Sequence, residues 1–396
     1  MRTRGQPVAL AAVRTMLRTG LPHALLLSGP AGVGTTTLAL DLAAALLCVG
    51  PVGTGRPCGE CRSCRMVRHG NHPDLHRLGP AGPGGLIVIG GRGERGVRDL
   101  VADLALMPVE GGARVAIVEA AQRMSEDAQS ALLKTLEEPP AGTTLILCAD
   151  DEERLLPTIR SRCARVRLGT IGPREVEAVL AEQGVADAPA AARLARITGG
   201  RPGQAIAYAR APEAIVIRGE ISRTLLDLLS AGVTARLAGV RDLAMRATDL
   251  VRALDAGAAR AAAQASEAPR RGGRARAPIA PGPVAESDPE ESPEAVSYEG
   301  TAKVPAAERR RGALALLEIW RTVVRDVGLA VVGDEARIRD QDLLDEVRPV
   351  AERLDARAVG AVLRRLDVAA EQLEGNVSPE LVLDGLALHW SPSGIG

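Results

Sequence analysis

The sequence has 396 residues, 46% of them hydrophobic, which predicts two or three globular domains with apolar cores. Its 49 basic and 49 acidic residues balance, so overall charge does not favour a nucleic-acid binder. The sequence contains neither an apolar run long enough to span a membrane nor a signal-peptide core, so we expect a cytoplasmic protein without membrane contact. In that compartment the six cysteines favour metal ligands or buried thiols over disulfides.

The first motif along the chain is a phosphate-binding loop. Residues 6–18 have helical spacing, an apolar run at 24–27 predicts a strand, and residues 38–47 predict the next helix. Between strand and helix, residues 29–37 read G-P-A-G-V-G-T-T-T, close to the pattern G-x-x-x-x-G-K-[ST]. The expected nucleotide-binding residues, in degenerate form, are Gly29, Gly32, Gly34, Thr35, Thr36 and, after a later strand, Glu119.

This loop lacks the groups that carry out phosphoryl transfer. Thr35 stands where a lysine should reach the terminal phosphates, and a charge-assisted hydrogen bond is worth roughly 1.5–3 kcal/mol. After the apolar run 115–118, the expected acidic pair reads Glu119-Ala120, so the group that would position the attacking water is a methyl. We therefore predict little or no ATP hydrolysis by the chain alone and doubt that it binds ATP and Mg²⁺.

Four cysteines lie in one short insertion after the loop helix. Cys48, Cys58, Cys61 and Cys64 include two overlapping C-x-x-C steps, and four thiolates form a closed tetrahedral zinc site. The Gly/Pro-rich residues between them have no core of their own, which a metal would fix. We predict a structural zinc module at residues 48–64. The alternative is a coincidental group of cysteines in a loop.

Helical and strand patterns alternate up to residue 168. A helix is expected at 126–136, a buried strand at 143–149, and an alternating strand at 165–168. Alternation of this kind predicts a parallel sheet flanked by helices.

Two blocks within this region carry a family resemblance. Residues 130–140 read S-A-L-L-K-T-L-E-E-P-P, and residues 156–163 read L-P-T-I-R-S-R-C. Together with the cysteine insertion, they resemble the bacterial clamp-loader subunits of the AAA+ superfamily. The resemblance covers residues 6–208 well and the remainder weakly. It implies an AAA+ P-loop domain at 1–168, a helical lid at 169–210, and an all-α collar for oligomerisation at 211–396.

The resemblance also implies roles for single residues. Arg162, in the S-R-C triplet, would act as an arginine finger in the ATP site of a neighbouring subunit; the alternative is a surface salt bridge. The lid segment G-G-R-P-G-Q-A at 199–205 has Gly203 where the family's motors have an arginine, which leaves the role of Arg201 open. Residues 261–306 are rich in Ala, Pro, Arg, Ser and Glu, and we predict a disordered insertion there.

The predicted function is therefore a non-catalytic stator subunit of the replicative clamp loader. The resemblance implies partners in a hetero-oligomeric ring, namely the gamma/tau and delta subunits, and through them the sliding clamp and primer-template DNA. Two alternatives remain. One is a slow ATP-hydrolysing motor of the gamma/tau kind, and the other, which the neutral charge disfavours, is a stand-alone DNA-binding protein.

Overall fold

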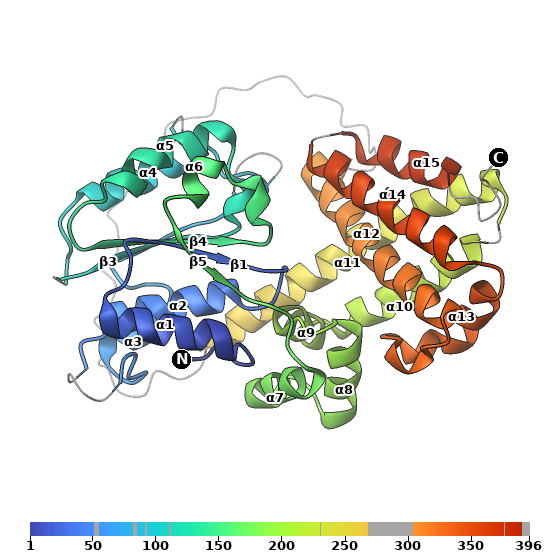
Figure 1. Ribbon diagram of the computed structural model, residues 1–396, viewed down its shortest axis with the longest axis horizontal. Coiled ribbons are helices and arrows are strands. Elements are labelled where there is room, and N and C mark those ends of the chain that lie inside the picture. The colour runs from blue at the N-terminus through green and yellow to red at the C-terminus, as the bar shows by residue number, and fades with distance from the viewer. Residues whose placement is uncertain are drawn as a thin grey trace, which may run out of the picture.

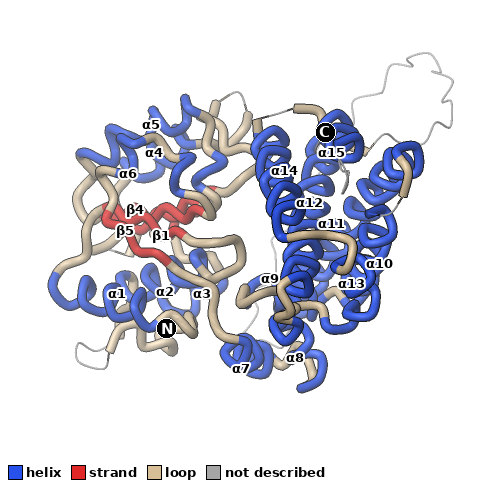
Figure 2. The backbone as a smooth tube through the Cα atoms, turned by 45° about the vertical axis from the view of Figure 1, so that its right-hand side comes forward, coloured by secondary structure: helices blue, strands red, loops and turns tan. Residues whose placement is uncertain are grey.

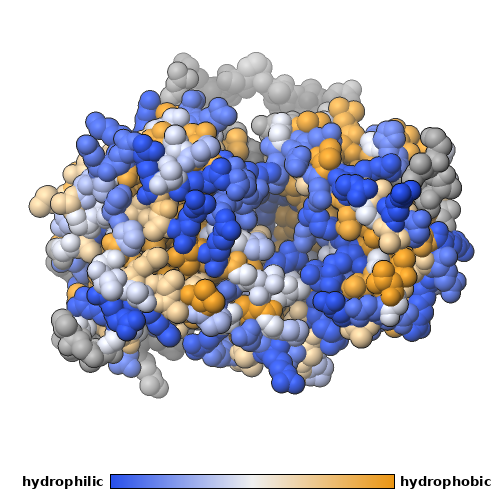
Figure 3. Space-filling model, viewed as in Figure 1, coloured by the Kyte–Doolittle hydropathy of each residue, from blue (hydrophilic) through white to orange (hydrophobic). Residues whose placement is uncertain are grey.

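The structure is a computed structural model that describes residues 1–50, 55–81, 85–91, 93–110, 112–229, 231–267, 304–375 and 377–389. An α/β module formed by the first 167 residues lies beside a helical region, with three short helices between them (Figure 1). Hydrophilic side chains cover most of the face shown in Figure 3, and apolar ones are scattered over both halves. No helix among the described residues is long and apolar enough to cross a membrane.

Five parallel strands form the sheet of the α/β module, in the order β2-β3-β4-β1-β5. They are β1 (Ala24–Ser28), β2 (Leu75–Leu78), β3 (Arg114–Val118), β4 (Thr143–Ala149) and β5 (Ala164–Arg167). Every residue of β1 and β3 is buried, as expected for strands covered by helices on both faces. The doubly wound parallel sheet predicted from the sequence is confirmed.

Helices cover both faces of this sheet (Figure 2). On one face lie α1 (Pro7–Thr19), α2 (Thr35–Leu46) and α3 (Arg62–His69), and on the other lie α4 (Val97–Ala105), α5 (Glu126–Glu137) and α6 (Pro157–Arg160). Alternate strand residues serve the two faces: Leu25 and Leu27 pack with α1 and α2, whereas Leu26 packs with α4 and α5. Since a parallel strand ends at the same edge as its neighbours, the loops that follow β1, β3 and β4 meet there.

The helical region contains nine helices within the described residues. They are α7 (Pro173–Gln183), α8 (Ala188–Ile197), α9 (Pro202–Arg210), α10 (Pro212–Leu229), α11 (Val233–Glu267), α12 (Ala306–Val331), α13 (Leu344–Ala351), α14 (Ala356–Glu374) and α15 (Pro379–His389). One apolar cluster runs from Ile171 to Ala387 and includes the fully buried Trp320. Helices α7–α9 therefore share a core with α10–α15, the group that contains the longer helices α10, α11, α12 and α14.

The predicted insertion needs a correction at its start. Helix α11 continues to Glu267, past the expected boundary at 261, and α12 begins at Ala306. The run Ala261-Ala262-Ala263 has high helix propensity, and Arg260 pairs with Glu213 of α10 at 2.6 Å, so the helix persists. The remainder of the predicted insertion, 268–303, lies outside the described residues.

Candidate functional site: a degenerate phosphate loop and a four-cysteine cluster

The phosphate loop joins the end of β1 to the start of α2, as the motif predicted. Gly32 has φ +84°, a left-handed conformation that favours glycine. Gly29 lies so close to the end of β5 that a Cβ there would meet the carbonyl oxygen of Leu168 at 2.2 Å. Thr35 is the first residue of α2 and is buried. The backbone frame for a polyphosphate is therefore present, with a hydroxyl at the position of the lysine.

The residues that follow β3 and β4 are engaged with neighbours. Glu119 pairs with Arg77 of β2, with 2.7 Å between Nε and Oε1. Asp150 accepts a hydrogen bond from Gln122 Nε2 at 3.1 Å, and burial raises the pKa of this carboxyl. Ala120 adopts a left-handed φ of +49° and offers only a methyl. At this edge of the sheet, the two carboxylates thus contact protein groups, and neither Thr35 nor Ala120 supplies a charge.

A cavity of about 200 Å³ lies beside the loop and shows what surrounds it. Gly34 and Thr37 line one side, and Arg2 and Arg4 of the N-terminal segment line another. The lid contributes Gly203 of α9. Gly203 N–H donates to the carbonyl oxygen of Gly32 at 2.8 Å, so the lid is bonded directly to the phosphate loop.

The structure gives Arg201 a partner away from the loop. Its Nη1 lies 2.6 Å from Glu318 Oε1 on α12, and its Nε donates to the carbonyl of Thr198 at 2.9 Å. Only 14% of the side chain is exposed. This guanidinium therefore connects the lid to the longer helices, which the sequence pattern did not reveal.

The four predicted metal ligands come together at the other end of α2. The Sγ atoms of Cys48, Cys58, Cys61 and Cys64 all lie within 4.8 Å of one another. Three of the pairs are 3.6 to 3.9 Å apart. A tetrahedron with Zn–S bonds of about 2.3 Å has edges of about 3.8 Å. The described residues thus place four sulfurs at a spacing that zinc fits.

Backbone N–H groups in the cluster point at sulfur. Cys61 N–H donates to Cys58 Sγ at 3.4 Å, and Cys64 N–H donates to Cys61 Sγ at 3.3 Å. Burial disfavours the Cys61 thiolate, but hydrogen bonds from Cys64 and Val49 outweigh it and lower the pKa of Cys61 to about 6. Burial raises the pKa of Cys64 to about 12. These N–H donors are the outer partners that stabilise bound thiolates.

Arg162 lies on the surface between α6 and β5. Its guanidinium pairs with Glu137 at the end of α5 and donates to the carbonyl of Thr158 at 3.0 Å. About a third of the side chain, 36%, is exposed. Arg162 does not line the cavity beside the phosphate loop of its own chain.

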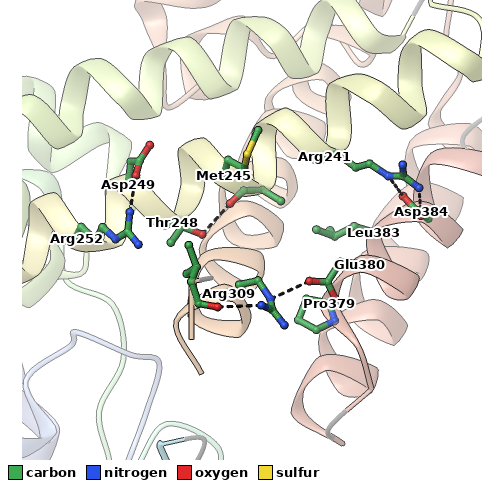
Figure 4. A pocket seen from close by; sticks show the side chains of 12 residues that line it. Arg241, Met245, Thr248, Asp249, Arg252, Arg309, Pro379, Glu380, Leu383 and Asp384 are labelled. Atoms are coloured by element: carbon green, nitrogen blue, oxygen red, sulfur yellow. Dashed lines mark hydrogen bonds and ion pairs between the residues drawn. The ribbon is translucent and has the colours of Figure 1, made fainter. Parts of the chain in front are cut away.

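A further pocket, which the sequence reasoning missed, lies among the longer helices. It has a volume of about 340 Å³ and is formed by α11, the start of α12, and α15 (Figure 4). Met245 and Leu383 provide apolar surface, and ion pairs at the rim join Arg309 to Glu380 at 2.9 Å and Arg241 to Asp384. Met245 stays 63% exposed on α11, which only the structure reveals.

The strand order, the loop after β1 and the helical lid define a P-loop module of the AAA+ class. A family model described as "DNA polymerase III, delta subunit" matches residues 5–172. Over 143 residues the chain is 43% identical to DNA polymerase III subunit delta' of Pseudomonas aeruginosa, covering 36% of this chain and 42% of that protein. Residues 5–172 are therefore similar to the delta-prime subunits of DNA polymerase III.

Other relatives extend this match. Subunit delta' of Escherichia coli is 38% identical over 187 residues, which cover 47% of this chain and 54% of that protein. Subunit tau of Salmonella typhimurium is 32% identical over 195 residues, or 48% of this chain and 29% of that protein. The chain spans about half the length of the curated delta-prime relatives it matches.

Proposed function

We propose that this chain is the delta-prime subunit of a bacterial clamp loader and acts there as a stator that does not hydrolyse ATP. The observation that carries the proposal is the phosphate loop itself. It keeps its fold, has Thr35 in place of the cation, and is bonded directly to the lid through Gly32 and Gly203. In this role the chain assembles with gamma/tau and delta subunits of the DNA polymerase III holoenzyme to load the sliding clamp on primer-template DNA.

In this role the chain has three parts with separate tasks. Residues 1–168 form the AAA+ domain, residues 169–210 the lid, and residues 211–396 the collar that joins neighbouring subunits. The fully buried Trp320 lies at the centre of the helices assigned to the collar, which supports a structural role for it. Zn²⁺ bound by the four cysteines has a structural role, because the four sulfurs leave no ligand position for water.

Arg162 is proposed to act on a neighbour. Its exposed guanidinium is oriented by Glu137 and by the Thr158 carbonyl, which reduces the side-chain freedom it would lose on entering an adjacent ATP site. There it would stabilise charge on the γ-phosphoryl group as an arginine finger. Such a residue supplied in trans accounts for roughly 10³–10⁵ in rate in other NTPases.

The test measures ATP hydrolysis with and without this chain. The purified chain should show no turnover, whereas adding it to gamma/tau and delta should give a complex with DNA-stimulated ATPase activity. Arg162→Ala should leave assembly intact and reduce hydrolysis at the adjacent site by roughly 10³-fold or more. The exposed Arg14→Ala on α1 serves as the matched control.

Two results would overturn the proposal. ATP hydrolysis above background by the isolated chain would favour the alternative, a slow gamma/tau-like motor. Failure to co-purify with any clamp-loader subunit would remove the stator role altogether. An assembled loader whose rate is unchanged by Arg162→Ala would refute only the arginine finger.

A further inference from the structure

The N-terminal segment makes a series of contacts that neither the phosphate loop nor the cysteine cluster requires. Residues 2–6 precede α1 and cross from the α/β module to the lid. Their polar contacts with Asp41, Gly169 and Glu182 join parts of the chain that are far apart in sequence. We propose that this segment is a strap that holds the lid at a fixed angle to the sheet.

The first anchor of the strap is Asp41, a buried carboxylate on α2. It accepts hydrogen bonds from the backbone N–H of Arg2 at 2.7 Å and from that of Thr3 at 2.9 Å. The hydroxyl of Thr3 donates to the same carboxylate at 2.8 Å. Asp41 is 5% exposed and Thr3 is also 5% exposed, so water competes little for these bonds. The start of the strap is therefore fixed to the helix that begins at the phosphate loop.

The second anchor is the connection between sheet and lid. Gly169 lies between β5 and α7, where any rotation of the lid must occur. The Gln6 side chain bonds both backbone groups of Gly169: Nε2 donates to its carbonyl at 2.6 Å, and Oε1 accepts from its N–H at 3.2 Å. Gln6 is 6% exposed. A paired amide contact of this kind restricts the backbone torsions of the connection itself.

A third contact reaches the lid directly. Arg4 pairs with Glu182 of α7 at 3.2 Å, although both side chains are about half exposed, so this pair adds little. Gly5 packs against Ile171, where an added Cβ would meet the isoleucine side chain at 2.7 Å. The strap and the start of the lid therefore pack closely at Gly5 and Ile171.

The consequence is a lid position set by protein contacts. The lid is also bonded to the phosphate loop through the Gly203 N–H and the Gly32 carbonyl. With these contacts in place, the lid cannot turn without breaking the hydrogen bonds of Gly203 or of Gly169. This device is internal to the chain, so it can be tested without partners and independently of the stator role.

The experiment follows amide hydrogen exchange in the full chain. The double variant Thr3→Ala/Gln6→Ala removes the strap's buried side-chain bonds, and Thr19→Ala/Gln372→Ala changes the same residue types at exposed sites as the control. The readout is the Gly203 amide, which the strap does not touch. We expect its exchange to be about tenfold faster in the double variant, with the amides of β4 unchanged. The radius of gyration of the double variant, measured by X-ray scattering, should also be larger than that of the control.

Each outcome decides the matter. Equal protection of Gly203 in the double variant and in the control, with β4 intact, would overturn the strap. If the double variant also loses protection in β4, the single variant Thr3→Ala decides in the same way. Faster exchange at Gly203 then supports the strap, and unchanged exchange overturns it.

Discussion

The phosphate loop and the cysteine cluster lie at opposite ends of the same helix, α2, and differ in what they have kept. At its N-terminal end the loop retains its backbone shape but lacks the cation and the acidic pair of a working NTPase. Beyond its C-terminal end, starting at Cys48, all four sulfurs of a metal site are present at ligand spacing. A loop whose backbone packs against the sheet keeps its conformation when catalytic side chains are replaced. A Gly/Pro-rich loop without a core needs all of its metal ligands to be held in one conformation.

The largest effect should come from breaking the cysteine cluster. Cys61→Ser should abolish binding of one equivalent of zinc and lower the free energy of unfolding by at least about 3 kcal/mol, since structural zinc contributes on the order of 10 kcal/mol in small zinc domains. Elemental analysis and urea denaturation measure both quantities. Cys163→Ala, a buried cysteine outside the cluster, is the control, and equal zinc in the two variants would contradict a four-cysteine site.

The next effect concerns the missing cation at the other end of α2. Thr35→Lys should tighten Mg-nucleotide binding by about 10- to 100-fold, because it restores a charge-assisted hydrogen bond. Turnover should stay at background, since Ala120 still lacks the group that positions the attacking water. Calorimetric titration and a phosphate-release assay measure the two outcomes, with Thr19→Lys as control. Hydrolysis by this single variant would show that the cation alone had been lost.

A smaller effect should separate loop shape from lid contact. Gly32→Ala meets a left-handed φ and places a Cβ 3.1 Å from the backbone nitrogen of Gln204, so it should cost about 1–3 kcal/mol of stability. Gly34→Ala meets a comparable φ of +108° but open space. The difference between the two variants in urea denaturation therefore isolates the lid contact. Equal stability of the two variants would mean that the lid moves away from the added Cβ at little cost in free energy.

The smallest effect is a pH dependence at the base of the loop. The Arg167 guanidinium, against an opposing effect of burial and with help from the Ser28 hydroxyl, lowers the pKa of Glu152. A lowered folded pKa adds stability above the unfolded value, and that stability is lost as pH falls through the folded pKa. Glu152→Gln should cost at most about 1 kcal/mol at pH 7, and the difference from wild type should shrink toward pH 3.

The control for this last prediction is the exposed Glu126→Gln on α5. Urea denaturation at both pH values measures the two variants. A constant difference between Glu152→Gln and wild type at both pH values would mean that Glu152 acts through its shape rather than its charge.

Local pattern was enough to predict strands β1, β3, β4 and β5, the loop after β1 and the four sulfurs. Apolar runs at 24–27 and 115–118 are buried strands, and the C-x-x-C steps do converge. The same reasoning ended α11 too early, because an alanine-rich stretch has the composition of a linker and the propensity of a helix. It left Arg201 without a role, because its partner Glu318 is 117 residues away along the chain.

The sequence by itself determined which chemical groups this protein has and lacks, because a side chain's charge and donor atoms belong to the residue: a hydroxyl at Thr35, a methyl at Ala120, four thiols. Only the tertiary structure decided how the lid is held. Gln6 meets Gly169 across 163 residues, and Gly203 meets Gly32 through backbone atoms that every residue type except proline offers. Such contacts depend on how the whole chain packs, so no local pattern encodes them.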